Sequence, residues 1–175
     1  MEENMEFEYT VTKKREGDYL AKRILAIVGY IVFGLTFFIG LSLLHLYQCI
    51  AFIVLVEWIL IFFTWRYVSI EYKYETLSGA IRFYTIYGGK NKKLLLDFRI
   101  KSFTEIVPFS DEISKRSFAK EIFCLSSMKA APDRYCAIYK DSNGQDCVVH
   151  FEATQKTLKI LKFYNSSTVI TNTRY

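Results

Sequence analysis

A single carboxylate, Glu57, stands in the middle of the apolar run AFIVLVEWILIFF at residues 51–63. A charged side chain at the centre of a bilayer costs about 3 kcal/mol, and in a soluble core it would need a buried partner. We therefore expect Glu57 to face protein and to be hydrogen-bonded. An antiparallel helical hairpin that turns at residues 45–48 would place Glu57 opposite Thr36.

Three interpretations of Glu57 are open. The acid can join two helices or two subunits, helped by close approach at Gly34 and Gly40. It can belong to a proton or ion relay, which would require an oligomer and further polar groups in the first apolar run, where the candidates are Tyr30, Thr36 and Ser42. It can also be a tolerated acid that reaches water.

Basic residues form two candidate surfaces. Lys90, Lys92 and Lys93 lie in the segment YGGKNKK, where two glycines allow a sharp turn. These lysines can lie on an anionic inner leaflet, each contributing about 1 kcal/mol near the surface, or form a solvated hairpin tip. The second set lines one face of a C-terminal amphipathic helix and consists of Lys156, Lys159 and Lys162.

Residues that commonly carry catalysis are few. His45 lies at the expected helical turn as an interfacial cap, and His150 lies on the less buried face of a strand. The chain lacks a Walker loop, a G-x-S-x-G turn, an H-E-x-x-H helix and any Cys/His cluster with metal-ligand spacing. We therefore predict no catalytic residues, no metal site and no cofactor.

Four cysteines are isolated from one another, which fits a reducing compartment better than a disulfide framework. We expect Cys136 and Cys147 to be buried structural thiols on the core face of one hairpin. Neither has an evident His or Lys partner that would lower the pKa of the thiol.

Two long apolar segments precede the polar part of the chain. Residues 24–44 are 21 residues without a charge, and at 1.5 Å per residue they span about 31 Å, close to a hydrocarbon core of about 30 Å. Residues 47–65 form a second run of 19 residues. A signal peptide is the alternative for the first run, but it would have a shorter apolar region and a cleavage site. Both runs are predicted to be transmembrane helices.

Basic residues gather at the outer ends of this helical hairpin, and none occurs in its turn. Lys13, Lys14, Arg15, Lys22 and Arg23 precede the first run, and Arg66 and Lys73 follow the second. The positive-inside rule therefore predicts a multi-pass protein of the cell membrane with both termini in the cytoplasm.

From residue 68 onward the apolar pattern has the two-residue period of half-buried strands. Seven strands are expected, at residues 68–77, 80–87, 92–100, 103–109, 120–127, 134–141 and 145–151. Residues 110–117 are polar and predict a loop, and Asp111 and Glu112 there are expected at the solvated surface. Asn143-Gly144 predicts a two-residue turn that pairs Ile138 with Val149 and Cys136 with Phe151.

The ends of the chain add three expectations. A helix at residues 152–165 should be capped by Thr154 and should bury the stripe of Leu158, Leu161 and Tyr164. Residues 166–175 are expected to form a loosely docked tail. Near the N-terminus, alternating Phe7, Tyr9 and Val11 predict one extra strand.

Seven antiparallel strands followed by one helix resemble the pleckstrin-homology (PH) superfold. The sequence also resembles a group of uncharacterised membrane proteins of Gram-positive anaerobic bacteria, which have two transmembrane helices and a cytoplasmic PH-like domain. The segments that carry this resemblance are YVSIEYKYETLSGAIRFYTIYGGKNKKLLL, SFTEIVPFSDE and AIYKDSNGQDCVVHFEATQKTLKILKFYN. It implies a mainly-β PH-like barrel or sandwich at residues 66–165, after an N-terminal segment (1–23) and a membrane hairpin (24–65), and before the tail (166–175).

The resemblance also implies two kinds of ligand. PH domains that bind phosphoinositides use a long, basic first-strand loop, which is reduced here to Ser78-Gly79. PTB and EVH1 relatives bind peptides, the former by strand addition, and the corresponding edge would be residues 120–127 beside residues 158–164.

These observations favour a non-enzymatic, membrane-anchored PH-like interaction or scaffold module. Membrane lipids, a protein partner at the PH-like domain and a homo-oligomer formed through the hairpin are the expected partners. Nucleic acid is not an expected partner, because residues 66–175 have only a modest excess of positive charge, with 18 basic and 11 acidic side chains. The alternatives are an oligomeric small transporter or channel accessory unit that uses Glu57, and an enzyme with an active site at the membrane boundary.

Overall fold

The computed structural model describes residues 6–14, 16–128, 131 and 133–170. Two compact units divide this chain. The helical unit contains residues 14–70 and 87–91, and the β-unit contains the rest of the described residues. Arg15 and residues 171–175, to which predictions were attached, lie outside the described residues.

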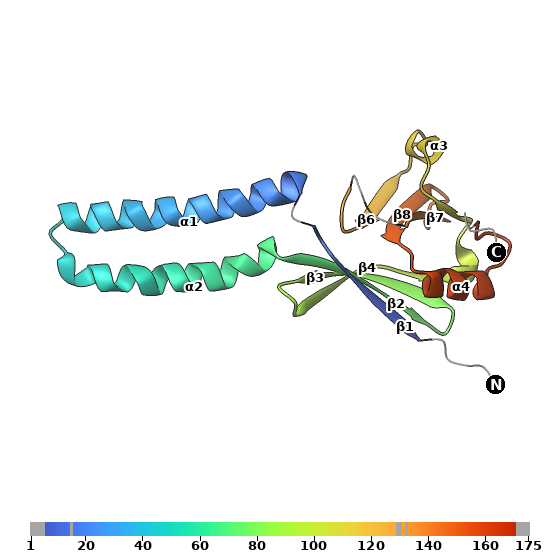
Figure 1. Ribbon diagram of the computed structural model, residues 1–175, viewed down its shortest axis with the longest axis horizontal. Helices are drawn as coiled ribbons and strands as arrows, with labels where there is room; N and C mark the ends of the chain where they lie inside the picture. The colour runs from blue at the N-terminus through green and yellow to red at the C-terminus, as the bar shows by residue number, and fades with distance from the viewer. Residues whose placement is uncertain (1–5, 15, 129–130, 132, 171–175) are drawn as a thin grey trace. The chain divides into compact units, whose positions relative to one another are not determined.

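The helical unit is built on two long helices that run antiparallel and side by side (Figure 1). Their bounds are α1 (Gly17–Leu43) and α2 (Ile50–Val68), with the 3-10 turn η1 (Tyr47–Cys49) before α2. Both helices are long and apolar enough to cross a membrane. In the most apolar 18-residue stretch of α1 no residue is buried, and in the corresponding stretch of Tyr47–Val68 6% of the residues are buried. The core helix of a soluble protein would be mostly buried.

The β-unit contains two four-stranded sheets. The first has the order β1-β2-β3-β4 and the second the order β5-β7-β8-β6. The strand bounds are β1 (Phe7–Thr12), β2 (Ile70–Leu77), β3 (Ala80–Tyr87), β4 (Asn91–Arg99), β5 (Glu105–Pro108), β6 (Lys120–Cys124), β7 (Arg134–Lys140) and β8 (Asp146–Glu152). The predicted N-terminal strand is confirmed, because β1 pairs with β2 in antiparallel register and Val11 is buried.

The seven strands predicted from residue 68 onward are present as β2–β8, and β1 brings the total in the described chain to eight. The prediction that all of them pair antiparallel is wrong, because β6 pairs with β8 in parallel. β7 lies between β5 and β8, so the chain leaves β6 at one edge of the sheet and crosses over before it enters β7. The predicted barrel is corrected too, because the described strands form two separate sheets that do not close.

The register of the β7–β8 hairpin differs from the prediction by one residue. The Asp141 carboxylate accepts hydrogen bonds from the backbone N–H groups of Asn143 (2.8 Å) and Gln145 (2.9 Å), which gives a wider loop than a two-residue turn. Ile138 therefore faces Val148, and Cys136 faces His150. The two thiols consequently belong to different apolar clusters, Cys147 to the main core and Cys136 to a smaller one.

Two segments predicted to be irregular carry structure. The expected loop at 110–117 contains the one-turn helix α3 (Asp111–Ser114), whose Ile113 is buried, while Asp111 and Glu112 are exposed as expected. In the predicted tail, Val169 is buried and pairs with Ile106 in an isolated bridge. Backbone hydrogen bonds of 2.9 Å on both sides of Ile106 hold this part of the tail against β5.

The helix α4 (Gln155–Tyr164) closes the core of the β-unit. Thr154 caps it by accepting a hydrogen bond from the Thr157 N–H (3.2 Å), which confirms the predicted cap. The predicted apolar stripe is only partly right, because Thr157, Ile160 and Leu161 are the buried residues of α4, while Leu158 and Tyr164 are partly buried.

A buried hydroxyl joins the first sheet to α4. Tyr74 on β2 donates to the carbonyl of Glu152 (3.0 Å), and its oxygen lies 2.8 Å from the Thr157 hydroxyl. Burial raises the pKa of Tyr74 to about 12, so the hydroxyl stays protonated and able to donate.

Two glycines provide a matched test of this packing. Gly79 (φ +78°) and Gly144 (φ +77°) have the same left-handed backbone, but a Cβ at Gly79 would lie 3.2 Å from the Tyr164 ring, and one at Gly144 would meet nothing within 4 Å. We expect Gly144→Ala to lower the free energy of unfolding by about 1 kcal/mol through backbone strain alone. Gly79→Ala should cost roughly 1 kcal/mol more.

Denaturant unfolding of the full chain in detergent measures both changes. Tyr164→Leu should reduce the extra cost of Gly79→Ala in a double-mutant cycle. Equal costs for the two alanine variants would contradict the contact between α4 and the β2–β3 turn.

Candidate functional site

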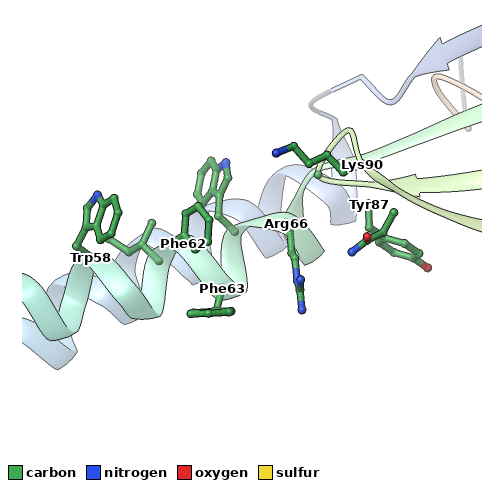
Figure 2. Close-up of a pocket in the computed structure, with 10 residues that line it drawn as sticks. Trp58, Phe62, Phe63, Arg66, Tyr87 and Lys90 are labelled. Atoms are coloured by element: carbon green, nitrogen blue, oxygen red, sulfur yellow. The ribbon is translucent and has the colours of Figure 1, made fainter.

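Aromatic and basic side chains surround a cavity of about 470 Å³ within the helical unit. Part of its lining comes from the last turns of α2, and the remainder comes from the turn between β3 and β4. The lining residues are Trp58, Ile61, Phe62, Phe63, Trp65, Arg66, Tyr87, Gly88, Lys90 and Asn91. Figure 2 shows Trp58, Phe62 and Phe63 projecting from α2, with Tyr87 and Lys90 beyond its end.

The β3–β4 turn fits closely against the end of α2 because of its two glycines. Gly88 (φ 59°) and Gly89 (φ 72°) both have a left-handed backbone, as a tight hairpin turn requires. The Gly88 N–H donates to the Ser69 carbonyl at 2.9 Å. A Cβ at Gly88 would lie 2.7 Å from the Cβ of Arg66, so a side chain there would force the turn away from the helix.

Arg66 is incompletely paired. Its Nη2 donates to the Tyr67 hydroxyl at 2.9 Å, and its guanidinium lies 4.9 Å from the centre of that ring. Its Nε is buried and has no hydrogen-bond partner among the described residues. A buried donor left without an acceptor costs about 1–3 kcal/mol, so an additional acceptor would stabilise this side chain.

The three predicted lysines of the turn have different surroundings. Lys90 is exposed and lines the cavity, and no carboxylate of the described chain pairs with its ammonium. Lys92 is 3.3 Å from a Glu75 oxygen and 5.8 Å from the centre of the Tyr84 ring. Lys93 is exposed outside the cavity. Hydrogen bonds from Lys73 and, to a smaller extent, from Lys92 hold the pKa of Glu75 below its usual range. Lys92 therefore already has an acidic partner on β2.

The basic face predicted on α4 is present at the surface. Lys156, Lys159 and Lys162 are all exposed. The Lys156 ammonium lies 4.9 Å from the centre of the Phe7 ring on β1, which is within the range of a cation–π contact. This lysine therefore covers the edge strand, while Lys159 and Lys162 remain available to solvent.

Glu57 has a different neighbour from the predicted Thr36. Its carboxylate lies against Gly34, where an added Cβ would be 3.0 Å from Oε2. The Thr36 hydroxyl instead donates to the Val32 carbonyl of its own helix at 2.8 Å. No described residue is hydrogen-bonded to Glu57, and the polar link between the helices is the 2.6 Å contact of the Tyr30 and Thr64 hydroxyls.

A buried polar cluster in the β-unit was missed by the sequence reasoning. Cys136 Sγ lies 3.0 Å from His150 Nδ1, and Arg134 Nη2 lies 3.3 Å from the same nitrogen. The Phe123 ring stacks on the imidazole with ring centres 4.7 Å apart. Only the corrected register brings Cys136 opposite His150, so no sequence signal short of the loop geometry would have found this pair.

The cluster is arranged to keep the imidazole of His150 and the thiol of Cys136 neutral. Arginine can only donate, so Nδ1 of His150 accepts and the ring proton lies on Nε2, which faces the Glu121 carboxylate at 3.7 Å. Burial, with a contribution from Arg134, lowers the pKa of His150 to about 4. Burial raises the pKa of Cys136 to about 11, so the thiol is not an activated nucleophile. No metal-binding group of three acidic, His or Cys residues occurs in the described part of the chain.

Acid should destabilise the β-unit through His150. The folded pKa of about 4 lies below the ordinary value of 6.5, so the neutral ring contributes stability above pH 6.5 that is lost as the pH falls toward 4. This difference corresponds to about 3 kcal/mol. His150→Gln should therefore flatten the pH dependence of the unfolding free energy between pH 7 and pH 4, measured on the full chain in detergent.

The other histidine provides the control for this measurement. His45 is exposed at the helical turn, and His45→Gln should leave the acid-induced loss unchanged. An unaltered pH profile in His150→Gln would show that the buried ring does not determine the acid sensitivity.

Comparison with known proteins gives one family match. A family described as Bacterial PH-like domain (DUF6106) matches residues 3–171. No curated protein and no solved structure gives a significant match. The matched region covers both the helical unit and the β-unit, so the two apolar helices lie inside the span of the family and not outside it.

Proposed function

We propose that this chain, which belongs to the Bacterial PH-like domain family, is a membrane-anchored interaction or scaffold module without catalytic activity. In this proposal α1 and α2 cross the cell membrane and both termini lie in the cytoplasm. The observation that carries the proposal is the exposure of the two helices. Twelve exposed large apolar side chains are on α1 and nine on α2.

A bilayer supplies the apolar medium that these side chains lack. Transfer of a large apolar side chain from water to an apolar environment is worth about 1.5–3 kcal/mol. α2 has 19 residues and is therefore about 29 Å long, which suits a hydrocarbon core of about 30 Å. Both helices carry a basic residue toward the same side of the hairpin, Arg23 in the second turn of α1 and Arg66 in the last turn of α2, which agrees with the positive-inside rule.

The connection between the units supports a role at the membrane surface. Only Ser69 separates α2 from β2. So short a linker would hold the β-unit at a high effective concentration near the lipid, and a weak affinity for lipid or for a membrane protein would suffice. Lys90 on the β3–β4 turn, and Lys159 and Lys162 on α4, are exposed cations proposed to meet anionic lipid or an acidic partner.

Membrane extraction and topology test this proposal. The full chain should remain in the membrane fraction after alkaline carbonate treatment, because only integral proteins resist it. A protease added to intact cells should leave the β-unit uncut, and it should cut the β-unit once the cells are lysed. Release by carbonate, or cleavage of the β-unit from outside, would contradict the anchored cytoplasmic arrangement.

A second candidate is an oligomeric transporter or channel accessory unit that uses Glu57. The observation that favours it is the half-buried Glu57 carboxylate, which has no hydrogen-bond partner in the described chain. A second copy could supply that partner, since polar groups in lipid are stabilised across helix interfaces.

Substitution of Glu57 separates the two candidates. If the acid joins subunits, Glu57→Leu should reduce crosslinked dimers in the membrane severalfold, whereas Glu57→Gln should retain them through its amide. A transporter should also show ion flux in vesicles that disappears in Glu57→Leu. Unchanged crosslinking and no Glu57-dependent flux would leave the scaffold proposal alone.

A further inference from the structure

The cavity beside the end of α2 is polar at one end and apolar at the other. Arg66 and Lys90 lie at the polar end, and Trp58 and Phe62 lie toward the middle of the helix. Arg66 is eight positions after Trp58, a distance of about 12 Å along the helix axis. The rings of Trp58 and Phe62 stack with centres 5.8 Å apart and are 66% and 65% exposed, so a long apolar surface continues from the cavity.

The charge of the cavity is uncompensated. Its lining includes two cationic side chains and no carboxylate. The buried Nε of Arg66 lacks an acceptor among the described residues, although Nη2 has one in Tyr67. An anion with several acceptor oxygens would pair with the exposed Lys90 ammonium and with the accessible N–H groups of the partly exposed Arg66, and guanidinium groups bind phosphate especially well.

The two cations approach the end of the helix from different sides. In Figure 2 the Lys90 side chain lies above α2 with Trp58, and the Arg66 side chain extends below it with Phe63. A compact inorganic ion would therefore meet one cation at a time. A larger molecule with a charged head and an apolar chain would use both ends of the cavity.

We propose that this cavity binds one anionic phospholipid. Its headgroup reaches around the end of α2, with the phosphate at one of the two cations and further headgroup oxygens at the other, and one acyl chain lies along Trp58 and Phe62. The inference rests on the proposed membrane anchoring and names the ligand of the module. It makes Lys90 and Arg66, and not the whole lysine cluster of the β3–β4 turn, the residues that select an anionic lipid.

The two tryptophans of the chain report directly on this site, since Trp58 and Trp65 both line the cavity and the chain has no others. The full chain is reconstituted in phosphatidylcholine vesicles that contain increasing fractions of either brominated phosphatidylglycerol or brominated phosphatidylcholine. Bromine quenches tryptophan fluorescence at contact, so the ratio of the two quenching curves measures selectivity for the anionic lipid.

The wild-type chain should prefer brominated phosphatidylglycerol several-fold. Lys90→Gln and Arg66→Gln should each reduce that preference, by about fivefold at most for one cation near the surface. Lys93→Gln is the matched control, because it removes the same charge three positions along the chain, at the start of β4 and outside the cavity, and it should retain the preference. Excess inorganic phosphate should not change the quenching, which separates a lipid site from a phosphate site.

The outcomes separate the two proposals. Equal quenching by both lipids would show that the helices are in the bilayer but have no anionic lipid site. If Lys93→Gln lowered the preference as much as Lys90→Gln, general surface charge would explain the preference, and the proposed site would be overturned. Quenching by neither lipid would instead overturn the membrane anchoring itself. Quenching by brominated phosphatidylcholine should be unchanged in each variant, which shows that the variant is folded and inserted.

Discussion

The β-unit depends on a single buried hydroxyl that joins parts of the chain about eighty residues apart. Tyr74 comes from the first sheet, and its hydroxyl is bonded to the end of β8 and to the first turn of α4. Its ring also contacts Phe83 and Phe151, with centres 5.8 Å from each. Loss of this hydroxyl would leave the Glu152 carbonyl and the Thr157 hydroxyl without this buried partner, and would remove a polar contact that fixes the first sheet against α4.

The helical unit is stabilised in a different way from the β-unit. Its helices are linked by the Tyr30–Thr64 hydroxyl pair, by the Arg23 guanidinium 5.2 Å from the centre of the Trp65 ring, and by packing at residues such as Ile53, and most of their large apolar side chains are exposed. Within the bilayer that we propose, this arrangement is stable because the backbone groups in the interior of each helix are already paired. Polar groups such as Thr36, Ser42 and Thr64 bond back to their own helices, so they do not need partners in lipid.

Local patterns in the sequence predicted most of the elements but not how they assemble. Alternating apolar residues located β2, β3, β7 and β8, because a strand period is a local property. The parallel pairing of β6 with β8 was missed because strand order is decided by contacts between distant segments. The register of β7 and β8 was wrong by one residue because the Asp141 side chain, and not Asn143-Gly144 alone, sets the loop. That single residue also hid the contact between Cys136 and His150.

The candidate site was predictable only in part. The lysines of the β3–β4 turn stand out in the sequence as a cluster, but the structure assigns them different neighbours: Lys90 lines the cavity and Lys92 approaches Glu75. From the sequence alone, Arg66 and the aromatic residues of α2 are typical of the interfacial residues at the end of a membrane helix. Their place beside Lys90 follows from Gly88, whose missing side chain lets residues more than twenty positions apart come together.

The burial of the thiols has a practical consequence for the natural sequence. Cys124, Cys136 and Cys147 are buried, and burial raises the pKa of the first two, whereas Cys49 before α2 is partly exposed. A maleimide would thus label the folded chain at one position without any engineered cysteine. In the membrane arrangement we propose, that position lies at the extracellular turn, so the wild-type protein carries its own single-site marker of sidedness.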